Sequence, residues 1–178
     1  MTSTNKEIKA IVGLGNPGPR FAFTPHNIGF LVLDRLCEMF ASSWTEKQNM
    51  MIATAQINHQ TIILIKPQTF MNNSGEILSH LNQRGIKLEN ILVVQDEIDF
   101  PFGKIGLKQG GSARGHNGLR SLIAHGGQDF IRLRLGVGRP DNPADVSDFV
   151  IAPFKQSKQD VDNLIKQAVD QVVGLLSS

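Results

Sequence analysis

Two side chains that can exchange protons stand far apart in this sequence, each in or beside a turn that follows an apolar strand. His26 comes after the glycine-rich segment 13–18, and Asp96 comes directly after the apolar run 91–95. An imidazole oriented by a carboxylate is a common general base. Side-chain amides occur in two further turns, 70–75 and 115–118. One base, one orienting acid and several amides indicate hydrolysis of a polar acyl substrate without a metal.

Other chemistries find less support in the residues. No His or Cys pair has the compact spacing of zinc ligands, so a metal held by His26, Asp96 and Glu97 stays an open but disfavoured alternative. A serine nucleophile is weakly supported, because the chain contains no G-x-S-x-G motif. The glycine-rich segment lacks G-x-G-x-x-G spacing and contains Pro17, so a tight turn that exposes Asn16 is favoured over a dinucleotide site.

Length and composition predict one soluble domain over residues 1–178, because 40% of the residues are hydrophobic and 19% are charged. No apolar run approaches the roughly 20 residues of a membrane span, and the polar segment Met1–Lys9 contains no secretory apolar segment. Cys37 is the single cysteine, which excludes an intrachain disulfide and is expected to be a small buried residue. We therefore expect a cytoplasmic protein with no membrane partner.

Apolar patterning predicts strands that alternate with helices along the chain. The expected strands are Ile8–Leu14, Met50–Ile57, Thr61–Ile65, Ile91–Gln95, Gly103–Gln109 and Phe130–Val137. The expected helices are Asn27–Phe40, Asn72–Gln83, Leu119–Ala124 and Lys158–Leu176. This order is typical of an α/β fold, and we expect a single domain in which helices flank a mixed, twisted β-sheet. Ligands of such folds gather at strand ends and in the loops that follow.

Basic residues are concentrated in one part of the chain, although the net charge is only +2. Seven Lys and Arg residues lie between Lys104 and Arg139, where Asp129 is the only acid. Alternation along the strand over 130–137 places Arg132 and Arg134 on one face. A local concentration of basic residues predicts a binding site for a polyanion. An equal alternative, on charge alone, is a solvated surface whose basic residues are balanced by acids from other segments.

Six segments, taken in order, resemble the bacterial peptidyl-tRNA hydrolase family. Each segment is weak evidence alone, but the ordered set is specific and spans nearly the whole chain. The segments are Val12–Gly18 (VGLGNPG), His26–Gly29 (HNIG), Lys66–Gly75 (KPQTFMNNSG), Gln95–Asp99 (QDEID), Gly115–Leu119 (GHNGL) and Arg132–Pro140 (RLRLGVGRP).

The resemblance implies a monomeric α/β enzyme that needs no metal or other cofactor and releases tRNA from peptidyl-tRNA. It implies that His26 is the catalytic base and Asp96 its partner. Substrate-binding residues would be Asn16, Phe21, Met71, Asn72 and Asn117, and Lys108 and Arg134 would meet tRNA phosphates. The expected contacts are with the tRNA acceptor arm, its 3′ end and the peptide, and we expect neither DNA nor a membrane as a partner.

The chain departs from the family pattern at three places. Phe21 stands where the family commonly has a tyrosine, Pro25 replaces a basic residue, and the end at Leu175–Ser178 is shorter than the usual basic tail. The role of His116, beside Asn117, stays open between the site and the structure. Two rival functions also stay open, namely a non-catalytic RNA-binding relative and a metal-dependent peptidase. The presence of His26, Asp96 and the asparagines favours the enzyme.

Overall fold

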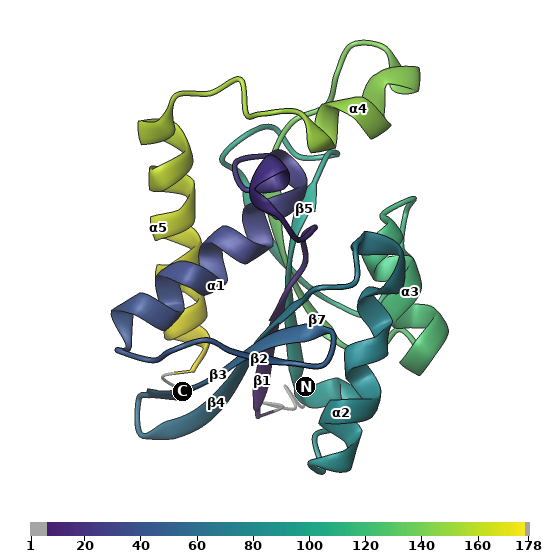
Figure 1. Ribbon diagram of the computed structural model, residues 1–178. Helices are drawn as coiled ribbons and strands as arrows, with labels where there is room; N and C mark the ends of the chain where they lie inside the picture. The colour runs from purple at the N-terminus through teal and green to yellow at the C-terminus, as the bar shows by residue number, and fades with distance from the viewer. Residues whose placement is uncertain (1–6, 177–178) are drawn as a thin grey trace, which may run out of the picture.

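The computed structural model describes residues 7–176, which contain one mixed sheet with the strand order β2-β3-β4-β1-β5-β7-β6 (Figure 1). Strands β4, β1, β5 and β7 pair in parallel, whereas β2–β3, β3–β4 and β6–β7 are antiparallel pairs. The predicted fold class is therefore confirmed. The strands are β1 (Ala10–Gly13), β2 (Thr45–Lys47), β3 (Met50–Ile57), β4 (Gln60–Pro67), β5 (Ile91–Glu97), β6 (Ile105–Gln109) and β7 (Ile131–Gly136).

Helices cover both faces of the sheet. In Figure 1, α1 and α5 lie on one face, and α2 and α3 lie on the other. The α-helices are α1 (Ile28–Met39), α2 (Ile77–Gln83), α3 (Asn117–Gly126), α4 (Val146–Ile151) and α5 (Lys158–Leu175). The 3₁₀ helices are η1 (Pro19–Phe21), η2 (Pro25–Asn27), η3 (Met71–Glu76), η4 (Leu88–Asn90) and η5 (Pro143–Asp145). None of the helices within residues 7–176 is both long and apolar enough to cross a membrane.

The central strands separate two apolar cores. Ile11 of β1 belongs to the core under α1 and α5, whereas its neighbours Ala10 and Val12 belong to the core under α2 and α3. Strand β5 alternates in the same way, with Leu92 on one side and Val93 on the other. Both faces of these strands are buried, which explains why their sequences are continuous apolar runs. Cys37 is buried, as expected.

The predicted elements are present, but several boundaries differ. Strand β5 continues through Glu97, because Glu97 pairs with Gly136 of β7, so Asp96 lies within the strand rather than after it. The helix predicted over 72–83 begins as η3, because Asn73 has non-helical dihedrals of −117° and 18°. Strand β2 and helix α4 were not predicted, since elements of three and six residues are too short to show a period.

Gly29 is required where α1 meets the sheet. A Cβ at this position would overlap the carbonyl oxygen of Val94 and lie 2.7 Å from the backbone nitrogen of Leu14. We expect Gly29→Ala to lower the free energy of unfolding by about 1–3 kcal/mol through overpacking, measured by chemical denaturation. Gly174 in α5 is the matched control, because nothing lies within 4 Å of a Cβ there. Equal stability of Gly29→Ala and Gly174→Ala would contradict this packing.

Candidate active site

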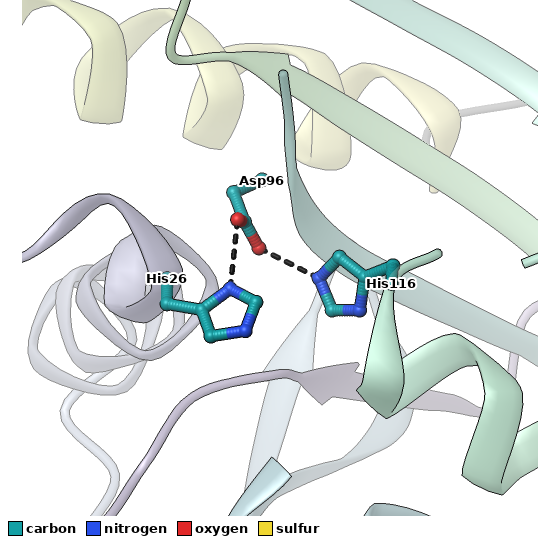
Figure 2. Close-up of side chains that lie close together, drawn as sticks. All are labelled: His26, Asp96 and His116. Atoms are coloured by element: carbon teal, nitrogen blue, oxygen red, sulfur yellow. Dashed lines mark hydrogen bonds and ion pairs between the residues drawn. The ribbon is translucent and has the colours of Figure 1, made fainter. Parts of the chain in front are cut away.

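The fold brings His26 and Asp96 into direct contact. His26 lies on η2, which connects the turn after β1 to α1, and Asp96 lies near the end of β5. The His26 Nδ1 atom is 2.8 Å from Asp96 Oδ2, and both residues are buried (Figure 2). Because Nδ1 faces the carboxylate, Nε2 is the nitrogen of His26 that is left to take a proton from a substrate or water.

His116 binds the other oxygen of the same carboxylate. Its Nε2 lies 2.7 Å from Asp96 Oδ1, and Figure 2 shows the two imidazoles converging on Asp96. Its Nδ1 accepts from the backbone N–H groups of Gly118 and Leu119, at 3.1 and 3.3 Å, and so caps α3. A nitrogen that accepts these bonds carries no proton, so His116 donates its Nε2–H to Asp96. His116 thus binds Asp96 and caps α3 at once, so its position combines the two alternatives that the sequence left open.

Burial and charge shift the pKa values of Asp96 and His26 in opposite directions. Burial raises the pKa of Asp96, but the two histidines and their hydrogen bonds outweigh burial and hold it far below its usual range. Burial lowers the pKa of His26, but the charge and hydrogen bond of Asp96 outweigh burial and raise it above 6.5. Asp96 is therefore ionised at neutral pH, and His26 is a stronger base than a free imidazole.

The pair lies in a cavity of about 520 Å³ that all the predicted site residues line. Helix α4 contributes one wall through Val146 and Val150. The predicted residues in the lining are His26, Asp96, Asn16, Phe21, Met71, Asn72, Asn117, Lys108 and Arg134.

Asn16 is buried, which corrects the expectation that its turn exposes it. The Asn27 side chain holds the turn from both sides, accepting from the Asn16 backbone nitrogen at 2.8 Å and donating to the Asn16 carbonyl at 2.9 Å. The Asn16 Oδ1 atom accepts from the backbone N–H of Met71 at 2.8 Å. Since its oxygen is occupied, the amide nitrogen is the group that Asn16 can offer to a ligand.

The remaining predicted substrate residues surround this amide. Asn72 and Asn117 are exposed in the cavity lining, and Met71 is buried in its wall. Phe21 packs edge-on against Phe70, with 6.4 Å between ring centroids. Phe70 was missed by the sequence analysis although it lines the cavity and is 56% exposed. Its apolar type gave no signal, and its positive φ of 58° is visible only in the structure.

The basic strand face is only partly available to a ligand. Arg132 is buried and donates to the backbone carbonyls of Gly111 and Ser112, so it supports the loop before α3. Arg134 lies 3.5 Å from Glu97 Oε1, with its guanidinium 4.6 Å from the Phe100 ring centroid. Glu97 of β5 thus neutralises part of this face, as the alternative of acids supplied by other segments predicted, but Arg132 is buried rather than solvated. The cavity lining still includes Lys108, Arg114, Arg134 and Arg139.

The hydrogen bonds of the site argue against the alternative of a bound metal ion. His26, Asp96 and His116 offer ligand atoms within 4.8 Å of one another, so the cluster differs from the one considered in the sequence by containing His116 rather than Glu97. Both carboxylate oxygens, however, face imidazoles, and His116 Nε2 carries a proton because Nδ1 caps α3. A metal would have to break these bonds, so the donor set suits proton transfer better.

Comparison with known proteins assigns the family. The peptidyl-tRNA hydrolase family model matches residues 10–178. The chain belongs to the peptidyl-tRNA hydrolase family. A peptidyl-tRNA hydrolase of Syntrophotalea carbinolica is 41% identical over 173 residues, covering 95% of this chain and 91% of the relative. One of an Exiguobacterium species is 42% identical, covering 93% and 94%.

A solved structure gives the same result for the fold. The crystal structure of peptidyl-tRNA hydrolase from Acinetobacter baumannii matches with a TM-score of 0.87 and 34% identity, over 99% of this chain and 91% of that chain. The resemblance seen in the six sequence segments is therefore confirmed at the level of family and fold. The end at Leu175–Ser178, which the sequence analysis gave as a departure from the family pattern, lies partly outside the described residues, at Ser177 and Ser178.

Proposed function

We propose that this chain hydrolyses the ester that joins a peptide to tRNA in peptidyl-tRNA, with His26 as general base. The observation that carries the proposal is the buried His26–Asp96 pair inside a cavity of a chain that belongs to this family. The substrate fits this site because an ester has a better leaving group than an amide, so a positioned base and hydrogen-bond donors suffice without a metal.

The reaction would begin with a water beside His26 Nε2. His26 takes one proton from this water as the oxygen attacks the ester carbonyl carbon, and Asp96 stabilises the imidazolium that forms. The carbonyl oxygen becomes an oxyanion. When the bond to the ribose oxygen breaks, the imidazolium returns its proton to that oxygen, and the free peptide and tRNA leave. His26 is then neutral again.

The amides of the cavity would bind the rest of the reacting group. Asn16, Asn72 and Asn117 line the cavity, and their amide nitrogens would donate to the developing oxyanion or to the peptide backbone. Asn16 is held in place by hydrogen bonds, because the Asn27 side chain binds its backbone and the Met71 backbone N–H donates to its side-chain oxygen. Preorganised donors of this kind stabilise the transition state without reorganising during the reaction.

The tRNA would lie across the basic side of the cavity. We propose that its acceptor arm and 3′ end meet Lys108 and Arg134, while the peptide occupies the side formed by Met71 and Phe21. Phosphate contacts orient a nucleic acid without reading its sequence, which suits an enzyme that must accept every tRNA. The family resemblance further supports a monomeric cytoplasmic enzyme that recycles tRNA from aborted translation.

Removing the Arg134 guanidinium should weaken tRNA binding. We expect Arg134→Ala to reduce the slope of log affinity against log salt by about 0.7–0.9, as for the loss of one phosphate contact. The measurement is a salt titration of tRNA binding, with Arg84→Ala, an exposed basic residue at the end of α2, as control. An unchanged slope in Arg134→Ala would remove Arg134 from the interface.

The function is tested with an N-blocked aminoacyl-tRNA as substrate. We expect the purified protein to release tRNA in the presence of excess chelator, because no step uses a metal. Binding of tRNA without release would instead indicate a non-catalytic RNA-binding relative. Activity that disappears in chelator and returns with a divalent cation would support the metal-dependent alternative.

A further inference from the structure

Asp99 joins two arginines that the proposed mechanism does not use. Arg139 Nη2 donates to Asp99 Oδ1, and Arg114 Nη1 lies 3.9 Å from Asp99 Oδ2. Asp99 lies in the turn after β5, Arg114 in the loop before α3, and Arg139 in the segment after β7. Both arginines line the cavity that contains His26 and Asp96. Three separate segments therefore place two guanidinium groups on the active-site cavity.

The backbone of Arg114 is unusual for its residue type. Its φ is +46°, in a loop where Gly110, Gly111 and Gly115 also have positive φ values of 71°, 106° and 83°. Residues with a Cβ occupy this left-handed region at a cost in conformational energy, whereas glycine does not. Backbone conformations of this kind are concentrated at functional sites, so the conformation agrees with a functional side chain at Arg114 and is supported by its place on the cavity.

The ion pairs with Asp99 leave the guanidinium groups of Arg114 and Arg139 accessible to a ligand. The side chains of Arg114, Arg139 and Asp99 are 65%, 43% and 37% exposed, and exposed ion pairs contribute little to stability. Together the three side chains carry a net charge of +1, so Asp99 brings the guanidinium groups together without neutralising them. A phosphate matches the planar fork of a guanidinium and would compete well for it. Arg134 differs, because it is 21% exposed and already faces Glu97.

We propose that Arg114 and Arg139 form a second phosphate-binding pair that holds the tRNA backbone at the cavity. The proposal rests on the proposed function and adds a contact that is distinct from Lys108 and Arg134. Because the contact is to phosphate, it raises the affinity for every tRNA and takes no part in the chemistry at His26.

Arg114→Gly tests the pair without straining the loop, because glycine accepts the positive φ. We expect the Kd for tRNA to rise about tenfold and the slope of log affinity against log salt to fall by about 0.7, the value for one single-strand phosphate. The free energy of unfolding should not fall. Arg114→Lys should keep part of the affinity, and Arg120→Ala, exposed on α3 and outside the cavity lining, should change nothing.

A substrate without phosphate separates this inference from the proposed function. An N-blocked aminoacyl-adenosine carries the ester but no phosphate, so Arg114→Gly should raise KM for the tRNA substrate and leave the kinetics of the adenosine ester unchanged. If Arg114→Gly matches wild type on the tRNA substrate, or impairs both substrates equally, the phosphate pair is wrong. A wild-type protein that hydrolyses neither substrate would instead overturn the proposed function.

Discussion

Replacing Asp96 with asparagine is expected to lower kcat by about 10³–10⁴-fold while tRNA binding is retained. The reason is the fixed tautomer of His116. Its Nδ1 caps α3, so its Nε2–H must donate, and only the oxygen of an asparagine can accept it. The amide NH₂ then faces His26 Nδ1, which forces the proton of His26 onto Nε2. In that tautomer Nε2 cannot act as a base.

This explanation predicts the behaviour of a double variant. His116→Asn keeps a residue that is favoured as a helix cap and removes the imidazole that fixes the amide orientation. Asp96→Asn combined with His116→Asn should therefore recover part of the activity, since the amide can turn its oxygen toward His26. Kinetics of the single and double variants give the answer. Asp96→Asn with wild-type kcat would contradict any orienting role for Asp96.

Replacing His26 with alanine is expected to lower kcat by about 10²–10⁴-fold, the usual contribution of a general base. KM should change little, because the proposed phosphate contacts lie elsewhere in the cavity. Steady-state kinetics with an N-blocked aminoacyl-tRNA measure both constants. The control is His59→Ala, since His59 is exposed in the β3–β4 turn. A raised KM with unchanged kcat would make His26 a binding residue rather than the base.

The sequence allowed the central pair to be predicted because His26 follows the turn after one apolar run and Asp96 lies at the end of another, in a chain whose pattern alternates between strand and helix. In an α/β sheet such positions converge at the carboxyl ends of the parallel strands, and His26 and Asp96 do so across 70 residues. The same rule could not predict the position of His116, because this side chain is held by hydrogen bonds both to the first turn of α3 and to Asp96.

Burial was the other property that the sequence did not determine. Arg132 and Arg134 alternate on one face of a strand, yet Arg132 is turned to loop carbonyls and Arg134 to Glu97. Asn16 was expected to be exposed, but Asn27 and Met71 enclose it. Which polar side chains are satisfied within the protein depends on long-range packing, which periodicity along the chain does not contain.

The most direct test of His26 as the base is the single-turnover rate of ester hydrolysis as a function of pH, in wild type and His26→Ala. A base must be deprotonated to act, and the pKa of His26 is raised, so the wild-type rate should rise along a limb whose apparent pKa lies above 6.5. The residual rate of His26→Ala should lack this limb. The same limb in His26→Ala would contradict the account, because another group would then be the base.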